Sequence, residues 1–245
     1  IAAGDTGMQT GFESVAHTEG FELFDGVDVE ELARRAALRA IAKLAARPAP
    51  SGEVPVVLAG VSGGVLFHDA CGHGLEADLV GKGASVYRGK VGELVASPLV
   101  TLIDDGTMTR EWGAIGIDDE GHASQRNVLI ENGVLTDYMW DHIRSVKEGR
   151  APSGNGRRQS YEHLPMVRMT NTFVLNGTDE PDDIVRATES GEACSENACV
   201  KVSSQRMRSS SPSSAPRQRS RRDCISPARV AHRASDSSRS ATCLR

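Results

Sequence analysis

Hydrophobic and polar residues follow helical and strand patterns over roughly the first 190 residues of the chain. The clearest helix runs from about Val29 to Ala46, where apolar residues recur at helical spacing. Asp28 precedes this helix as an N-cap, Glu31 follows three residues later, and Pro48 ends the helix. The pattern is typical of an amphipathic helix that packs on a sheet.

Shorter apolar runs around this helix predict strands. Val54–Ala59 has the composition of a buried strand, and the dipeptide Asn132-Gly133 predicts a tight hairpin between two strands. The other expected elements are strands over 99–103, 126–131, 134–139 and 168–175, a pair of strands within 11–24, and helices over 64–80, within 138–147 and over 181–189. Together these elements predict an α+β fold that is rich in strands.

The hydrophobic pattern stops near Gly191. From Ser203 onward Ser and Arg dominate the sequence, and neither helical nor strand periodicity survives. Such a segment buries too little apolar surface to offset the entropy of ordering, so we expect disorder there. We therefore divide the chain into an incomplete domain over 1–190 and a Ser/Arg-rich tail over 191–245.

The formal net charge is −5, which does not indicate a nucleic-acid-binding protein. This average combines an acidic part up to about residue 190 with a strongly basic remainder. Only Cys71 lies in the patterned part, which favours a reducing, cytoplasmic setting. No apolar run is long enough to cross a bilayer, and no signal peptide is visible. Because the chain begins at Ile1 in mid-pattern, we expect a fragment.

The stretch Val65–Asp78 carries the candidate chemistry. It places His68 and His73 five residues apart, with Asp69 directly after the first histidine. Imidazole and carboxylate groups are ligands of divalent metals, and a carboxylate beside such a metal can activate water. The stretch is therefore a candidate for metal-assisted hydrolysis.

The spacing of the two histidines differs from that of the simple zinc pair. Residues i and i+5 lie about 140° apart on a regular α-helix, so the two rings would point away from each other. They converge only if the helix widens, as in a π-bulge, or breaks before His73, and Gly72 and Gly74 permit such a distortion. The spacing alone fits either a metal pair or two structural histidines on a glycine-rich turn.

Neighbouring polar residues also allow two interpretations each. Glu76 and Asp78 are either acceptors that orient the rings or, more commonly, solvated helix charges. Cys71 fits a small buried residue better than a ligand. We expect three further histidines to be surface or packing residues, and these are His122, His142 and His163.

Two polar segments, over 153–161 and 169–172, could line an open sheet edge that binds an extended peptide. In that case Arg157 or Arg158 would pair with a peptide carboxylate. Alternatively, Gly154 shapes a turn in this loop and the arginines form structural ion pairs.

The residues Phe67–Asp78 resemble the metal-binding motif of the TldD/PmbA metallopeptidases, a family also described as modulators of DNA gyrase. The likeness covers residues from roughly 10 to 190 and includes several further segments in order. These are Pro48–Leu58, Ile103–Thr107, Ile117–Gly121, Asn127–Gly133, Gly154–Tyr161 and Pro165–Thr172. The chain resembles TldD more than its partner PmbA/TldE, because the partner lacks the histidine motif.

The resemblance implies a β-rich TldD/PmbA C-terminal-type domain and a zinc peptidase that cleaves unstructured peptides. It implies that His68 and His73 are zinc ligands and that Asp69 is the catalytic carboxylate. It also implies a heterodimer with a TldE/PmbA-like partner subunit in the cytoplasm, without contact to a membrane or nucleic acid.

The chain departs from the family in three ways. The family has Glu where Asp69 stands, so the carboxylate falls on the order of 1 Å short of the attacking water, which can slow the reaction about 100-fold. The family's N-terminal domain is not recognisable. Neither are its late Gly-rich strands and the Cys that is its third zinc ligand, and Cys194 and Cys199 would replace that Cys only if their segment is native.

We interpret the basic segment as translation in a wrong frame that begins near residues 190–193, with a genuine RNA-binding tail as the alternative. Three functions follow for this chain, in decreasing order of preference. They are an impaired TldD-like zinc peptidase, a non-catalytic subunit that keeps the fold and assembles with a partner, and a nucleic-acid-binding protein that acts through its tail. Because two histidines alone seldom hold zinc, we expect weak or absent zinc binding.

Overall fold

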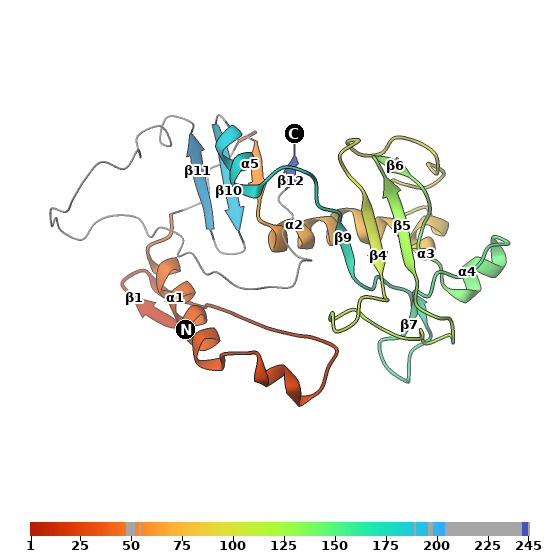
Figure 1. Ribbon diagram of the computed structural model, residues 1–245, viewed down its shortest axis with the longest axis horizontal. Helices are drawn as coiled ribbons and strands as arrows, with labels where there is room; N and C mark the ends of the chain where they lie inside the picture. Colours follow the sequence, from red (N-terminus) through yellow and green to blue (C-terminus); the bar gives the residue numbers. More distant parts are fainter. Residues whose placement is uncertain (48–51, 54, 189, 196–197, 204–241, 245) are drawn as a thin grey trace.

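The computed structural model describes residues 1–47, 52–53, 55–188, 190–195, 198–203 and 242–244 (Figure 1). These residues form an α+β fold in which helices pack on mostly antiparallel sheets, as the sequence predicted. Figure 1 shows α2 (Gly60–Phe67) running between two four-stranded sheets, and it contacts β9 of one sheet and β10 of the other. In this part of the chain, no helix is long and apolar enough to cross a bilayer.

The central sheet has the strand order β6-β5-β4-β9, and all of its pairs are antiparallel. Its strands are β4 (Leu102–Asp105), β5 (Arg126–Glu131), β6 (Val134–Leu135) and β9 (Thr172–Val174). Asn132 and Gly133 join β5 to β6 with φ angles of 48° and 83°. Two consecutive positive φ angles are typical of a type I′ turn, so the predicted hairpin is confirmed.

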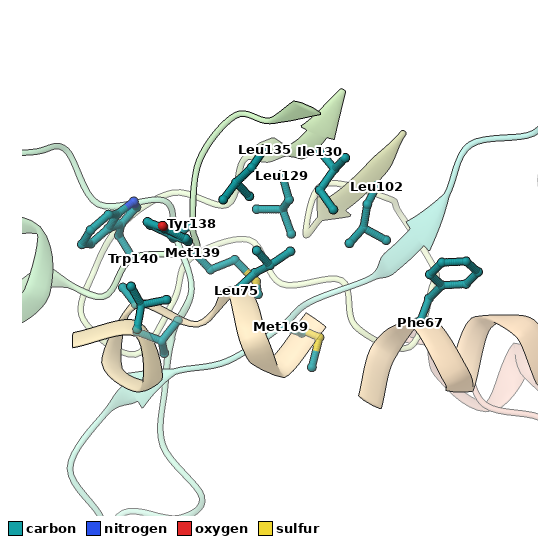
Figure 2. Packing of buried hydrophobic residues seen from close by; sticks show 13 residues of the cluster. Phe67, Leu75, Leu102, Leu129, Ile130, Leu135, Tyr138, Met139, Trp140 and Met169 are labelled. Carbon is teal, nitrogen blue, oxygen red and sulfur yellow. The ribbon is translucent and has the colours of Figure 1, made fainter. Parts of the chain in front are cut away.

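The hydrophobic core lies between this sheet and the segment that carries the two histidines (Figure 2). Leu102, Leu129 and Leu135 contribute fully buried side chains from the sheet. Leu75 and Met139 are equally buried and pack against them from the opposite side. The histidine segment is thus fixed to the sheet by apolar contacts.

The predicted helix over 64–80 is helical over most of its length but divides into four parts. After α2 come a π-helix, η2 (His68–Gly72), and a short 3-10 helix, η3 (His73–Leu75). Glu76 then has extended backbone angles and forms a bridge with Met139 before α3 (Ala77–Gly81) begins. This long-range bridge ends the helix within the predicted span.

The N-terminal region contains a hairpin of β1 (Ala2–Gly4) and β2 (Gly7–Gln9), the 3-10 helix η1 (Phe21–Asp25) and the helix α1 (Val29–Leu44). The Asp28 side chain accepts a hydrogen bond from the Glu31 backbone N–H at 2.9 Å, which confirms the predicted N-cap. The remaining elements of the first 188 residues outside the two four-stranded sheets include β7 (Gly156–Arg157), β8 (Met166–Val167), α4 (His142–Lys147) and α5 (Pro181–Ala187).

The predicted pair of strands within 11–24 is wrong, because the start of this segment lies against α1, Thr18 bonds to Arg110 and residues 21–25 form η1. Arg39 and Lys43 of α1 donate hydrogen bonds to the carbonyls of Phe12 and Thr10, each at 2.9 Å. Side chains of the helix therefore satisfy carbonyl groups that a partner strand would otherwise bind.

A second four-stranded sheet has the order β11-β10-β3-β12. Its strands are β3 (Val56–Leu58), β10 (Ser190–Ser195), β11 (Ala198–Ser203) and β12 (Thr242–Leu244). β10 pairs in parallel with β3, so strand structure continues past residue 190, where the hydrophobic pattern stops. Most of the predicted disordered or out-of-frame tail falls on 204–241 and 245, which lie outside the described residues.

Candidate metal centre

The π-helix brings the two imidazoles together. The backbone N–H of His73 donates to the carbonyl of His68, a hydrogen bond over five residues that widens the turn. The two ring centroids are 5.0 Å apart and the rings meet edge to face at 82°. The distortion that convergence requires is therefore present.

The glycines of the motif are needed for a different reason than the predicted backbone freedom. Gly72 has ordinary right-handed helical angles, and a Cβ added there would collide with the sulfur of Met169. A Cβ at Gly74 would lie 2.9 Å from the ring of Tyr87. Close packing of the histidine segment on its neighbours thus excludes larger side chains at both positions.

His68, Asp69 and His73 form a group that could hold a metal ion. Their candidate ligand atoms all lie within 4.8 Å of one another, and no other such group of three occurs among the described residues. Both histidines are half-buried, whereas Asp69 is exposed, so the group is open to solvent on one side. Two nitrogen donors and one oxygen donor suit zinc, and the residues present therefore fit this metal.

The surroundings of His68 favour the neutral ring that a metal ligand requires. Burial is the main cause that lowers the pKa of His68, and the neighbouring His73 lowers it further. Asp69 and Asp104 act in the opposite direction, and Arg157 contributes the smallest lowering effect. The net direction is a pKa below the ordinary value of histidine.

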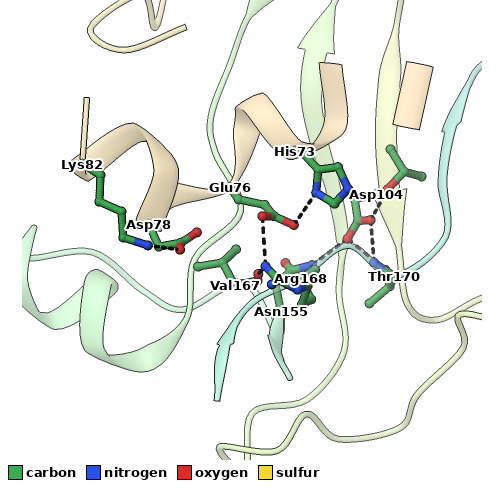
Figure 3. A network of polar contacts seen from close by, with 10 residues as sticks. His73, Glu76, Asp78, Lys82, Asp104, Asn155, Val167, Arg168 and Thr170 are labelled. Atoms are coloured by element: carbon green, nitrogen blue, oxygen red, sulfur yellow. Dashed lines mark hydrogen bonds and ion pairs between the residues drawn. The ribbon is translucent and has the colours of Figure 1, made fainter. Parts of the chain in front are cut away.

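The buried carboxylate of Glu76 joins His73 to an arginine from a distant part of the chain (Figure 3). His73 Nδ1 lies 3.2 Å from Glu76 Oε1, and Arg168 Nη1 lies 3.1 Å from Glu76 Oε2. Glu76 is only 1% exposed. Burial raises the pKa of Glu76, and Arg168 is the main influence that opposes this rise.

The interpretation of Glu76 and Asp78 as solvated charges is wrong, because both side chains are buried. The backbone bridge to Met139 draws Glu76 into the core region, where it contacts His73. Asp78 pairs with Lys82 at 3.0 Å, and its other carboxylate oxygen bonds to neither ring in the described part of the chain. The ring-orienting geometry that the sequence allowed for both residues is thus observed for Glu76.

Asp104 lies beneath the same site and was missed by the sequence analysis. Its fully buried carboxylate accepts hydrogen bonds from the Thr170 backbone at 2.8 Å, the Thr172 hydroxyl at 2.6 Å and the Asn155 amide at 2.7 Å. Because strand β4 continues through Asp104, the aspartate belongs to the sheet and does not close the strand as expected. An acidic residue that directly continues the apolar run of a strand is the sequence signal that could have revealed Asp104.

The polar loop over 153–161 has a structural role in the observed fold. Asn155 is 1% exposed and bonds to Asp104, and a Cβ added at Gly154 would lie 2.6 Å from a backbone carbonyl. Gly154 also has a positive φ of 74°, as the turn interpretation requires. Arg158 pairs with Asp119, whereas Arg157 lies exposed on β7. Binding of a peptide by this loop stays a prediction.

The other candidates lie outside the ligand group. Cys71 is half-buried and packs against the hydrophobic core. Burial and a hydrogen bond with Cys71 raise the pKa of Tyr87 above its usual range. His122 and His142 stack on each other with ring centroids 5.1 Å apart, and His163 bonds to Ser160. These histidines have the surface and packing contacts that were expected.

A family model for the PmbA/TldA metallopeptidase C-terminal domain matches residues 51–196, which is more than half of the chain. The chain belongs to the PmbA/TldD metallopeptidase family. The matched span contains the complete ligand group and the central sheet. The resemblance inferred from the histidine motif is therefore confirmed.

Among curated relatives of this PmbA/TldD family member, a metalloprotease TldD homolog of Haemophilus influenzae is 47% identical over 173 residues. That match covers 70% of the chain and 36% of the relative, so the chain spans about a third of the relative's length. A metalloprotease of Methanothermobacter thermautotrophicus is 39% identical over 191 residues, which are 78% of the chain and 42% of the relative.

Two solved structures share the fold. A candidate modulator of a DNA gyrase from Thermotoga maritima has a TM-score of 0.61 and 27% identity, with 70% of this chain and 39% of that chain covered. TldE from Thermococcus kodakarensis has a TM-score of 0.59 and 27% identity, with 69% and 38% covered. The α+β fold is thus that of the TldD and TldE proteins.

Proposed function

We propose that this chain carries the metal centre of a TldD-type zinc peptidase, with His68 and His73 as zinc ligands and Asp69 as the general base. The observation that carries the proposal is the convergence of these three side chains on a π-helix. A relative from Saccharolobus solfataricus, 30% identical over 170 residues, is named a zinc metalloprotease TldD homolog, which supports zinc as the metal.

Zinc in such a site acts as a Lewis acid toward a peptide carbonyl and lowers the pKa of water. The half-buried rings of His68 and His73 would hold the metal. Asp69 takes the proton of the attacking water and passes it to the leaving amine. Its exposed position lets it meet a substrate without movement of the core.

The substrate class in this proposal is an unstructured peptide, as the resemblance to the TldD peptidases implies, and the ligand group is open to solvent on one side. The proposed partner is a TldE-like subunit, and the shared fold with Thermococcus TldE supports it. A cytoplasmic location and the absence of nucleic-acid binding stay predictions from the sequence.

A non-catalytic subunit is the second candidate, and one observation favours it. The Asp69 carboxylate is itself close enough to both histidines to act as the third ligand. In that arrangement the metal would be held by two nitrogens and one oxygen, and no base would stand beside it.

Zinc titration of the complete 245-residue chain tests the proposal. We expect one weakly bound zinc per chain that is lost in His68→Ala and His73→Ala and kept in the control His122→Ala. Cleavage of a mixture of unstructured peptides, followed by mass spectrometry, separates the peptidase from the non-catalytic subunit. Zinc binding that is unchanged in both ligand variants would overturn the metal site.

A further inference from the structure

We propose that Arg168 is a positioning residue that acts through Glu76 to fix the orientation and tautomer of His73. The role of His73 as a zinc ligand rests on the proposed function. The effect of Arg168 and Glu76 on the His73 ring concerns the metal-free protein. Arg168 lies 92 residues after Glu76 in the sequence, and the two meet at the candidate site through a 3.1 Å ion pair.

The contact between His73 and Glu76 determines which nitrogen of the His73 ring is available to bind a metal. An ionised carboxylate oxygen only accepts hydrogen bonds, and the paired Arg168 favours the ionised form of Glu76, so the Nδ1 that lies 3.2 Å from Glu76 Oε1 carries the proton. The lone pair of the neutral ring is then on Nε2, which is free to bind a metal. A ring with the opposite tautomer would present an N–H to the metal and could not serve as a ligand through that nitrogen.

Arg168 fixes the direction in which the Glu76 carboxylate points. Its Nη1 binds Glu76 Oε2, so the other oxygen faces His73. The same Nη1 donates to the carbonyl of Val167 at 2.8 Å, which holds the guanidinium against the backbone. Without Arg168, a carboxylate that is 1% exposed would lose its cation and its second fixed contact.

The backbone of Arg168 is itself held at both of its polar groups. Its N–H donates to the carbonyl of Asn155 and its carbonyl accepts from the Asn155 side chain, each at 2.9 Å. The Asn155 amide also donates to the buried Asp104 at 2.7 Å. The guanidinium therefore extends from a hydrogen-bonded backbone toward Glu76, as Figure 3 shows.

The neighbouring pair of Asp78 and Lys82 provides an internal control. It joins a buried carboxylate to a cation as well, at 3.0 Å, although Lys82 is more exposed than Arg168, and Asp78 lies only two residues after Glu76. The second oxygen of Asp78 has no hydrogen-bond partner in the described structure, so this pair does not touch an imidazole. Removal of the Lys82 cation should affect the stability of the fold in a similar way without changing the tautomer of His73.

The experiment uses NMR of the isotope-labelled, metal-free chain at a pH where histidine is neutral, with the His73 signal assigned from a His73→Ala variant. We expect the Nδ1–H tautomer in the unmodified protein, a mixture of tautomers in Arg168→Met, and partial recovery in Arg168→Lys. Lys82→Met should match the unmodified protein. Zinc affinity should fall about 10- to 100-fold in Arg168→Met.

Two results would overturn the proposal. One is an Nε2–H tautomer of His73 in the unmodified protein, a measurement that does not depend on whether any variant folds. The other is a folded Arg168→Met variant that keeps the single Nδ1–H tautomer. Absence of zinc binding in the unmodified protein would contradict the proposed function and leave the tautomer result standing, so the two failures are distinguishable.

Discussion

Replacement of Asp69 by Glu should raise the peptidase activity of this chain. The exposed side chain of Asp69 has room for one more methylene, and its ligand atom already lies within 4.8 Å of both histidine nitrogens. The extra length moves the carboxylate on the order of 1 Å toward the attacking water, and a misplacement of that size can cost about 100-fold in rate. We therefore expect kcat to rise by up to about 100-fold, or about 2.7 kcal/mol of transition-state stabilisation.

The assay follows peptide cleavage by mass spectrometry at saturating zinc, with zinc affinity measured in parallel. Asp69→Asn should abolish the activity, and Asp182→Glu is a matched control because its side chain is 89% exposed and belongs to α5. Equal cleavage rates for Asp69→Glu and the unmodified chain, at equal zinc occupancy, would refute the role as base. A loss of zinc affinity in Asp69→Glu would instead identify Asp69 as a ligand and support the non-catalytic subunit.

Three further predictions concern the stability of the fold and the site. Gly72→Ala should destabilise the protein by about 1–3 kcal/mol in urea unfolding, because the new Cβ collides with Met169; an unchanged midpoint would contradict the close packing. Asp28→Ala should cost about 1 kcal/mol through loss of the α1 N-cap, with Asp25→Ala in η1 as a control. The lowered pKa of His68 means that the unfolded chain binds a proton first, so metal-free stability should be complete above about pH 6.5 and fall as the pH drops toward the folded pKa. Thermal unfolding of the unmodified protein and His68→Ala between pH 7.5 and 5 measures this difference, and identical pH profiles would exclude the effect.

The sequence predicted those elements that depend on local interactions. The N-cap of α1 and the Asn132-Gly133 turn involve residues only a few positions apart, and both were found as expected. The sequence named a widened or broken helix as the condition for the rings of His68 and His73 to converge, and the π-helix meets that condition. Whether the rings converge was left open by the spacing alone.

The errors arose where distant parts of the chain meet. Residues 11–24 do not form strands, because Arg39 of α1 binds the Phe12 carbonyl and Thr18 bonds to Arg110 in a distant loop. Glu76 was expected in solvent on a helix, but its bridge to Met139 and its pairing with Arg168 bury it. Such contacts depend on the tertiary arrangement, which periodicity along the chain does not contain.

The π-helix has a consequence for how changes of length would affect the motif. One wide turn contains one residue more than an α-helical turn, so the two rings are separated by a single turn although they are five positions apart in the sequence. A deletion of one residue between them could convert the wide turn into a regular one and leave both rings on the same side. An insertion of one residue would require a turn wider than that of a π-helix, and proteins have no regular helix with such a turn. The geometry of the metal centre should thus tolerate shortening of this segment better than lengthening.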